Sequence, residues 1–300
     1  MMKRVTAVIT THKREPEIVQ RALESVLMQT YPEMEVIVVD DSPSDYPRRN
    51  DVAKLVRSYH KQGVLYIPHQ KCQGACVARN TGLAHATGEF IAFLDDDDQW
   101  TPEKISLQLE AFTDDTIALV YSGQVVLDES SGNRSVSKTQ YHSGQVYEKL
   151  IYNNFIGSTS IPLLRTSALR SIGGFDPLMQ SSQDYDVWLR LAQAFSVAYV
   201  EGALVVYHTH PGERISTNFK KKISGLERIN EKNQECLKKD KRARWIRTVK
   251  LVPMYAGDGQ LGKALRCWVK VVFTCPGQVK TNLRYLVRAF KCYGKRKCSL

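Results

Sequence analysis

Four consecutive aspartates are the feature of this sequence that most directly suggests chemistry. Asp95–Asp98 follow the apolar run 90–94 without a break, and such a concentration of carboxylates is costly unless a cation neutralises it. Residues two apart in a strand point the same way, so Asp95 and Asp97 can share one ligand. Mg²⁺ prefers oxygen ligands and often takes one or two carboxylates plus substrate phosphates. Spacing alone leaves a second interpretation open, a solvated acidic turn or helix-capping cluster before Pro102.

The elements that would position these aspartates alternate between strand and helix. The sequence predicts helices at 16–27, 52–60 and 75–86 and apolar, strand-like runs at 5–9, 35–39, 64–67 and 90–94. This alternation is typical of an α/β fold in which helices cover a parallel sheet. Ligands of open α/β sheets bind at the carboxyl ends of the strands. Asp40–Asp41 and the four aspartates both follow such ends.

The pattern becomes mixed beyond residue 100. The sequence predicts a helix at 105–112, a strand at 117–121 and an exposed loop or hairpin at 128–143. Mixed α/β signals follow over 145–219, with a turn at 173–176 and a helix at 183–195. From Phe219 onward the signals are helical and basic.

Charge is distributed unevenly along the chain. The 300 residues carry a formal net charge of +11, but residues 1–219 carry −6 and residues 220–300 carry +17. This uneven charge distribution suggests that the C-terminal part faces something anionic, either a membrane surface or a polyanion. The reaction site would then lie in the N-terminal part.

Cysteine spacing and hydropathy predict the compartment. The seven cysteines lack the paired CxxC spacing of a zinc site, and reduced thiols are the simpler interpretation. The first residues lack the apolar core and cleavage site of a signal peptide. No stretch approaches the ~20 apolar residues that a membrane span needs. We therefore expect a cytoplasmic protein, peripheral at the inner face of the cell membrane if its basic region binds lipid.

Seven separate segments resemble the family 2 glycosyltransferases, which have the GT-A fold. In order they are VITTH (8–12), SVLMQTY (25–31), VVDDS (38–42), ARNTGL (78–83), FLDDDDQW (93–100), GGFD (173–176) and QDYDVWLR (183–190). The resemblance covers about residues 4–216. It implies an α/β GT-A catalytic domain, Rossmann-like with a mostly parallel sheet flanked by helices, at 1–219. A basic, mainly helical region at 220–300 follows it.

The resemblance assigns five residues to the donor nucleotide. Thr10 opens the pocket, and His12 stands where the family often has a tyrosine packed against the base. Asp41 matches the acid that accepts from the N3 proton of uracil, which favours a UDP-sugar. Arg79 matches an arginine near the pyrophosphate. Asp96 is expected to touch the ribose or Arg79.

The resemblance also implies a metal. Asp95 and Asp97 match the family's Asp-X-Asp pair, which would hold Mn²⁺ or Mg²⁺, with Asp97 as the direct ligand. The segment 207–212 resembles one in which a histidine approaches the metal or the diphosphate. Of its two histidines we favour His210 over His208.

Asp184 matches the aspartate of the family's Glu-Asp pair, the general base, and Gln183 stands where the glutamate is usual. In the implied inverting mechanism Asp184 takes the proton of an acceptor hydroxyl while that oxygen attacks the anomeric carbon. A helix N-cap role for Asp184 is compatible with this assignment. Asp176 and Trp188 are assigned to the acceptor.

The favoured function is a metal-dependent inverting glycosyltransferase that moves a sugar from a nucleotide-sugar to a saccharide or lipid-linked acceptor, in cell-surface polysaccharide or glycolipid biosynthesis. One alternative is an inactive relative that binds nucleotide-sugars or anionic surfaces. A nucleotidyltransferase ranks lower, because residues 10–14 contain no glycine. For residues 220–300, helices packed on the body and docking on an anionic leaflet both stay open, and nucleic acid is disfavoured because no recognised motif accompanies the charge.

Overall fold

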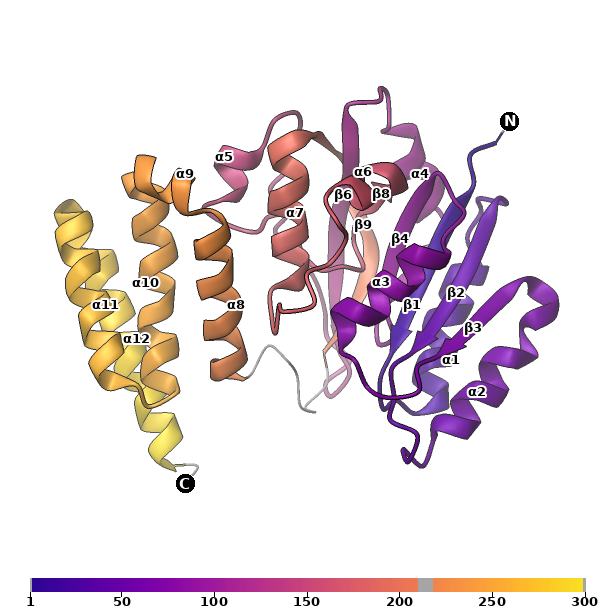
Figure 1. Cartoon of the computed structure of the whole chain (residues 1–300), viewed down its shortest axis with the longest axis horizontal. Coiled ribbons are helices and arrows are strands. Elements are labelled where there is room, and N and C mark those ends of the chain that lie inside the picture. Colours follow the sequence, from indigo (N-terminus) through magenta and orange to yellow (C-terminus); the bar gives the residue numbers. More distant parts are fainter. Residues whose placement is uncertain (1, 210–217, 299–300) are drawn as a thin grey trace. The chain divides into compact units, whose positions relative to one another are not determined.

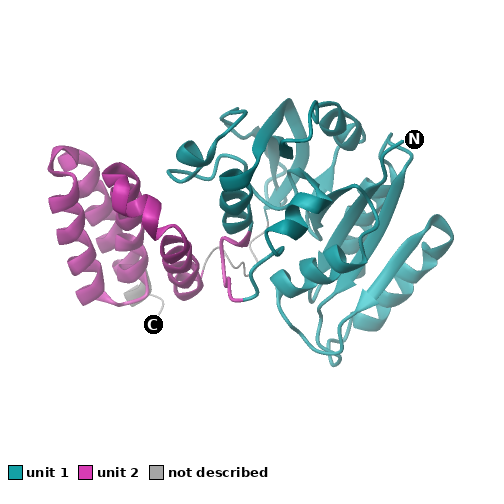
Figure 2. Cartoon of the chain, turned by 45° about the horizontal axis from the view of Figure 1, so that its top comes forward, with its two compact units in different colours: residues 1–177, 184–211 teal, residues 178–183, 212–300 magenta. Residues whose placement is uncertain are grey.

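The chain folds into two compact units (Figure 2). The structure is a computed structural model and describes residues 2–209 and 218–298. Residues 1–177 and 184–211 form the first unit, and residues 178–183 and 212–300 form the second. The boundary expected after residue 219 lies close to residue 212. The sequence analysis does not anticipate that the short segment 178–183 joins the second unit.

The first unit is built on a mixed sheet that has nine strands among the described residues (Figure 1). Its strands are β1 (Val5–Thr11), β2 (Met34–Asp40), β3 (Val64–Pro68), β4 (Phe90–Asp95), β5 (Gln99–Trp100), β6 (Ile117–Asp128), β7 (Arg134–Val136), β8 (Leu163–Arg165) and β9 (Ser196–Thr209). Its helices are α1 (Pro16–Leu27), α2 (Arg49–Ser58), α3 (Ala75–His85), α4 (Lys104–Glu110), α5 (Tyr147–Leu150), α6 (Thr166–Ser171) and α7 (Gln183–Ala194).

The strand order is β3-β2-β1-β4-β8-β6-β9-β5, with β7 paired to β6. The strands β3, β2, β1 and β4 are parallel, whereas β8 is antiparallel to both β4 and β6. The long strands β6 and β9 are parallel to each other. This arrangement confirms the α/β fold with a mostly parallel sheet that the sequence predicts.

Burial on both faces explains the apolar runs of the central strands. Nearly every residue of β1 and β4 is buried, as is typical of parallel strands covered by helices. Helix α3 packs against β1 and β2. Gly82 permits this approach, because a Cβ atom there would lie 2.3 Å from Cγ1 of Val8.

Two strands differ from the sequence prediction. The strand expected at 117–121 continues as β6 to Asp128, and the polar stretch after it returns as β7, antiparallel to β6. The mixed signals of 145–219 include the 14-residue strand β9. Register shifts interrupt the pairing of β6 with β9, so neither strand shows a simple alternation of buried and exposed residues.

From residue 218 onward the described part of the second unit is helical. Its helices are α8 (Phe219–Lys232), α9 (Gln234–Lys239), α10 (Lys241–Gly257), α11 (Leu261–Thr274) and α12 (Val279–Cys298). Helix α10 packs against α8, α11 and α12, and a cluster of buried apolar side chains lies between them. No helix in the described part of the chain has the length and apolar character needed to cross a membrane.

Candidate active site

The carboxyl ends of β1, β2 and β4 lie side by side and bring the predicted site residues together. Thr10 of β1 is opposite Asp95 of β4 in the parallel register. The backbone N–H of His12 donates to Oδ2 of Asp96 at 3.3 Å. The ring nitrogen Nδ1 of His12 lies 3.0 Å from the carbonyl oxygen of Asp41. Three loops that are far apart in the sequence therefore form one site.

The four aspartates alternate between partly exposed and buried side chains. Those of Asp95 and Asp97 are 30% and 21% exposed, whereas Asp96 and Asp98 are buried. Ser160 Oγ donates to Oδ2 of Asp98 at 2.6 Å. Burial and the neighbouring charges of Asp95 and Asp97 raise the pKa of Asp98 well above its usual value. Asp98 therefore belongs to the interior, and Asp95 and Asp97 direct carboxylate oxygens outward.

Two arginines neutralise these carboxylates. Arg14 donates from Nε to Asp96 at 2.8 Å and from Nη2 to Asp97 at 2.5 Å. Arg79 on α3 donates to Oδ1 of Asp95 at 2.7 Å. Burial raises the pKa of Asp96 to about 6, and the charge of Arg14 limits that rise. Paired guanidinium and carboxylate groups at a strand end can exchange partners when a diphosphate and a cation arrive.

The outward carboxylates fit a hard divalent cation. Asp95 and Asp97 offer oxygen ligands of the kind that Mg²⁺ and Mn²⁺ prefer. Thr159 Oγ1 lies 3.1 Å from both carboxylate oxygens of Asp95 and fixes their orientation. The predicted ligand pair is therefore chemically suited to the ion.

Of the two histidines in the segment 207–212, the structure describes only His208. His210 lies outside the described residues. His208 is buried, with Nδ1 2.9 Å from Oε1 of Glu129 and Nε2 2.9 Å from Oε1 of Gln99. Arg21 donates to Glu129 at 2.8 Å and to the backbone of the aspartate segment at 3.0 Å. His208 therefore helps to support the aspartate segment, and the role of His210 stays a prediction.

The carboxylate of Asp41 already accepts several hydrogen bonds. Its Oδ1 accepts from His69 Nδ1 at 2.8 Å and from the N–H of Gln73 at 2.7 Å. Its Oδ2 accepts from the N–H of Gly74 at 2.7 Å and from Cys72 Sγ at 3.4 Å. Burial alone would raise the pKa of Asp41, but these hydrogen bonds outweigh it and hold the pKa below its usual value. Asp41 thus anchors the loop 70–74, whereas the sequence analysis expected its oxygens to face uracil.

The exposed ring of His12 has a defined hydrogen-bonding polarity. The carbonyl oxygen of Asp41 can only accept, so Nδ1 of His12 donates this hydrogen bond, and in the neutral imidazole Nε2 is left as an acceptor. Lys13 follows with a left-handed φ of 52°, uncommon for a residue other than glycine. Its N–H donates to Ser42 Oγ at 2.9 Å. This turn after β1 brings Arg14 to the aspartates.

Asp184 lies in the first turn of α7, and its side chain is partly buried. Asn154 Nδ2 donates to Oδ2 of Asp184 at 3.2 Å. Desolvation raises the pKa of Asp184 to about 6, the charge of Arg79 opposes the rise, and that of Asp95 adds to it. The carboxyl is therefore close enough to Arg79 and Asp95 to respond to their charges. A pKa near 6 leaves a carboxylate that is mostly ionised at neutral pH and able to accept a proton.

The two predicted acceptor residues have different surroundings. Asp176 is half-buried and near enough to Cys76 for its charge to raise the pKa of that thiol, after the larger effect of burial. Its assignment to the acceptor stays a prediction. Trp188 is fully buried, and its Nε1 donates to the carbonyl oxygen of Gly157 at 3.0 Å. This burial corrects the expectation that Trp188 contacts the acceptor: the indole instead supports the loop 153–159.

Three residues of the site were not selected from the sequence. Arg14 stands just past the end of β1, so the rule that ligands bind at carboxyl ends could have found it. Asn154 and Thr159 contact Asp184 and Asp95 from a loop that has no periodic pattern. Only the fold brings that loop to the aspartates.

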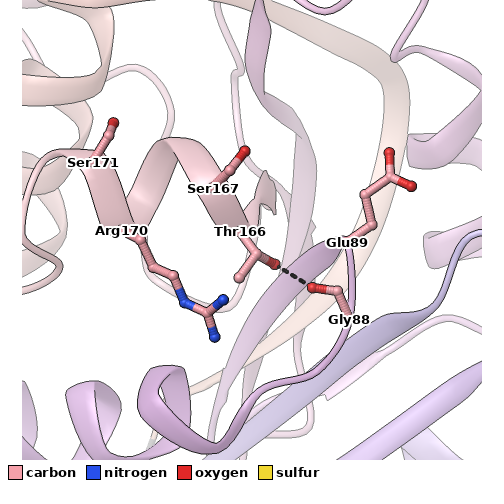
Figure 3. Close-up of a pocket in the computed structure, with 6 residues that line it drawn as sticks. All are labelled: Gly88, Glu89, Thr166, Ser167, Arg170 and Ser171. Carbon is pink, nitrogen blue, oxygen red and sulfur yellow. Dashed lines mark hydrogen bonds between the residues drawn. The ribbon is translucent and has the colours of Figure 1, made fainter.

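A pocket of about 530 Å³ lies at the other end of β4 (Figure 3). Thr166 Oγ1 donates to the carbonyl oxygen of Gly88 there at 2.8 Å. Its lining consists of Gly88, Glu89, Thr166, Ser167, Arg170 and Ser171. Because these residues lie at the amino end of β4, away from the aspartates, the pocket is separate from the candidate active site.

Comparison with known proteins places this site in a family. The family model described as Glycosyl transferase family 2 matches residues 6–173, which include the loops after β1, β2 and β4. The chain belongs to glycosyl transferase family 2. The resemblance inferred from seven sequence segments is thereby confirmed, and the protein is a glycosyltransferase that uses a nucleotide-sugar donor.

Two curated relatives in this family come from Escherichia coli. The putative colanic acid biosynthesis glycosyl transferase WcaA, from strain K12, is 31% identical over 219 residues, which cover 72% of this chain and 76% of WcaA. The UDP-Glc:alpha-D-GlcNAc-diphosphoundecaprenol beta-1,3-glucosyltransferase WfgD is 29% identical over 196 residues, which cover 65% of this chain and 72% of WfgD.

Solved structures share the fold over nearly the whole chain. Staphylococcus aureus TarS (residues 1–349), in complex with UDP-GlcNAc, matches with a TM-score of 0.68 and 15% identity, covering 99% of this chain and 91% of that one. The Pyrobaculum calidifontis mannosyltransferase PcManGT, in complex with GDP-Man and Mn²⁺, matches with a TM-score of 0.60 and 15% identity, covering 98% and 87%. These matches confirm the GT-A fold of this family 2 member.

Proposed function

We propose that this protein is a metal-dependent, inverting glycosyltransferase that transfers a sugar from a UDP-sugar to a lipid-linked saccharide at the cytoplasmic face of the membrane. The relatives WcaA and WfgD are named for colanic acid biosynthesis and for transfer to a GlcNAc-diphosphoundecaprenol acceptor. Both names support a role in cell-surface polysaccharide assembly. The observation that carries the proposal is that one loop contacts both carboxylates: Asn154 donates to Asp184 at 3.2 Å and Thr159 donates to Asp95 at 3.1 Å. This loop therefore links the proposed base to the proposed diphosphate site.

The chain's own residues account for donor binding and proton transfer. Arg79 and Arg14 form ion pairs with the aspartates and can donate hydrogen bonds to the diphosphate oxygens when the donor binds. Asp95 and Asp97 would hold a divalent cation, which would supply positive charge to stabilise the departing nucleotide diphosphate. Asp184 accepts the proton of the acceptor hydroxyl as that oxygen attacks the anomeric carbon. Asn154 orients the carboxylate of Asp184 for this role.

A contact from His12 favours a uridine donor. In the neutral imidazole its Nε2 is an acceptor, since Nδ1 donates to the carbonyl oxygen of Asp41. The N3–H of uracil is a donor and matches it. This contact replaces the one first expected from the Asp41 carboxylate, whose oxygens are occupied by the loop 70–74.

A transfer assay tests the proposal. UDP-Glc, UDP-GlcNAc, UDP-Gal and GDP-Man are offered in turn with a synthetic GlcNAc-diphospho-lipid, with Mn²⁺ or EDTA, and the product is identified by mass spectrometry. We expect one UDP-sugar to be used in the presence of Mn²⁺. Asp184→Asn should lower the rate by about 10²–10⁴-fold, because the acceptor hydroxyl loses its general base, while donor binding persists. The surface variant Glu148→Gln should match the wild type.

Three results would contradict the proposal. Undiminished transfer in EDTA would contradict the metal dependence. A preference for GDP-Man would contradict the assignment of a uridine nucleotide. Normal turnover by Asp184→Asn would contradict the assignment of Asp184 as the general base.

A further inference from the structure

The last two helices of the second unit expose large apolar side chains. On α11 the exposed positions recur every four residues, at Leu261, Leu265, Val269 and Phe273, with exposed fractions of 45, 59, 41 and 82%. On α12 they recur at Val279, Leu283, Val287 and Phe290, with exposed fractions of 58, 50, 53 and 67%. Spacings of three and four place residues on one side of a helix. Each helix therefore carries an apolar stripe that the fold leaves uncovered.

The core-facing sides of these helices are different and already occupied. Ala264 and Val271 of α11 are buried against α10 and its neighbours, as is Ala289 of α12. Asn282 of α12 accepts at Oδ1 from Trp245 Nε1 at 2.8 Å. Because these contacts fix the inner side of each helix, the exposed stripes are not needed for packing within the second unit.

Basic side chains lie beside both stripes. The exposed ones are Lys263, Arg266 and Lys270 on α11 and Lys280, Arg284, Arg288 and Lys291 on α12. Successive residues are rotated by about 100° around a helix axis. The basic side chains therefore lie along the edge of each apolar stripe that is farther from the core. The sequence 259–300 contains ten Lys or Arg residues and not one Asp or Glu. The surface thus combines apolar and exclusively positive groups.

We propose that the exposed sides of α11 and α12, which carry these eight apolar and seven basic side chains, bind lipid and dock the protein on a membrane containing anionic phospholipid. Large apolar side chains can enter the headgroup region while Lys and Arg contact the anionic headgroups, and the two contributions reinforce each other. The inference goes beyond the proposed transfer reaction and does not depend on the identity of the donor.

Two other partners, a second copy of this chain and a nucleic acid, fit this surface less well than a membrane does. A second copy of this chain would bring two positive surfaces together, which repel. A nucleic acid would neutralise the basic groups but leave four exposed apolar side chains on each helix without a partner. A bilayer interface satisfies both kinds of group.

Vesicle flotation with the full chain tests the proposal. The vesicles are phosphatidylcholine alone or phosphatidylcholine with about one third phosphatidylglycerol, each at low and high salt. We expect binding to the anionic vesicles only, weakened by salt because the headgroup contacts are screened. Phe273→Ser with Phe290→Ser should lower the partition coefficient at least about tenfold, since two large apolar groups no longer enter the interface. Lys263→Glu with Arg266→Glu and Lys270→Glu should lower it similarly.

Matched controls separate the surface from general charge and hydrophobicity. Val136→Ser removes an exposed apolar side chain on β7, and Lys220→Glu with Lys221→Glu and Lys239→Glu changes the net charge as much as the α11 triple variant. Both should bind anionic vesicles within about twofold of the wild type. Circular dichroism and thermal unfolding verify that each variant is folded.

A conservative variant keeps the test decisive if the serine variants fail to fold. Phe273→Trp retains aromatic bulk, and its added indole emission should shift to the blue with anionic vesicles. Absence of vesicle binding by the wild type, equal binding to neutral vesicles, or full binding by the serine variant would overturn the proposal. So would self-association that is lost in Phe273→Ser without any vesicle binding. None of these results depends on turnover, so they are distinguishable from failure of the proposed function.

Discussion

At the scale of single residues, the carboxyl of Asp184 has the properties of a general base that works near neutral pH. The surrounding protein raises its pKa to about 6, and Arg79 keeps the rise moderate. A base is most effective when its pKa lies near the working pH. An exposed aspartate would be ionised but too weak a base, and the partial burial of Asp184 corrects this.

We expect the transfer rate to fall as the pH drops through about 6, because protonated Asp184 cannot accept the hydroxyl proton. Above that pH the carboxylate is ionised and the rate should level off. The measurement is kcat between about pH 5 and pH 8. The residual activity of Asp184→Asn should lack this acid limb. A rate that is constant across the range, or that keeps the same limb in the variant, would contradict the assignment.

We propose that Arg14 competes with a cation for Asp97. Its Nη2 lies 2.5 Å from Oδ2 of Asp97, and a metal ion held by Asp97 would bind the same carboxylate. We expect Arg14→Gln to bind Mn²⁺ several-fold more tightly in the absence of a nucleotide, because the competing guanidinium is gone. Isothermal titration calorimetry measures the affinity.

The comparison variant for Arg14→Gln is Arg48→Gln, which removes an exposed guanidinium paired with Glu15 and Asp51. Its Mn²⁺ affinity should equal that of the wild type. Weaker Mn²⁺ binding by Arg14→Gln would show that Asp97 is not a metal ligand.

The aspartates and Trp188 show what residue types can and cannot predict. Alternation along a strand predicted that Asp95 and Asp97 would point together. Both side chains are partly exposed, but β4 ends at Asp95, so the turn that follows, not strand alternation, places Asp97. The same reasoning cannot tell that Trp188 turns inward to Gly157. A motif gives the position of a side chain in the sequence, whereas its neighbours in space decide which way it points.

At the scale of elements, α3 joins the sheet to the proposed diphosphate site. The helix carries Arg79, and Gly82, one turn further on, rests on Val8 of β1. Asn80 pairs with the backbone of Phe175 through two hydrogen bonds, at 2.7 and 2.8 Å. The close approach of α3 to β1 thus fixes both Arg79 and the turn that precedes Asp176.

We expect Gly82→Ala to destabilise the protein by about 1–3 kcal/mol, because the new Cβ overlaps Val8 and forces the helix outward. Alanine's better helix propensity recovers up to about 1 kcal/mol of this. Urea unfolding followed by circular dichroism measures the change. Ala84→Ser on the exposed side of the same helix should change stability by less than about 0.5 kcal/mol. An unchanged or raised stability for Gly82→Ala would contradict this account of α3.

The sequence predicted the parallel half of the sheet well because its strands are short, apolar and followed by turns. It did not predict β9, since residues 196–209 pair with β6 through register shifts that blur the alternation. Nor could it assign 178–183 to the second unit, because Ser181 contacts Lys221, forty residues away, through a hydrogen bond that leaves no local pattern.

At the scale of the whole molecule, the two parts of the chain have net charges of opposite sign. Residues 1–219 carry a net −6 and include the proposed catalytic groups, while residues 220–300 carry +17. The electrostatic repulsion among the clustered carboxylates of the first unit is reduced locally by ion pairs with Arg14 and Arg79. The positive charge of the second unit is therefore not needed to neutralise them, and we propose that it binds an anionic surface.

The central claim is that the strand ends of β1, β2 and β4 bind a nucleotide-sugar together with a divalent cation. Thermal unfolding with UDP, GDP, CDP and TDP and their common sugar conjugates, each with Mn²⁺, Mg²⁺ or EDTA, tests it most directly. A ligand at a hundredfold excess over its Kd stabilises the folded state by about 2.7 kcal/mol. We predict a metal-dependent rise in Tm with a UDP-sugar, and its loss in Asp97→Ala. Stabilisation by no nucleotide, or by one that binds equally well in EDTA and to Asp97→Ala, would contradict the account.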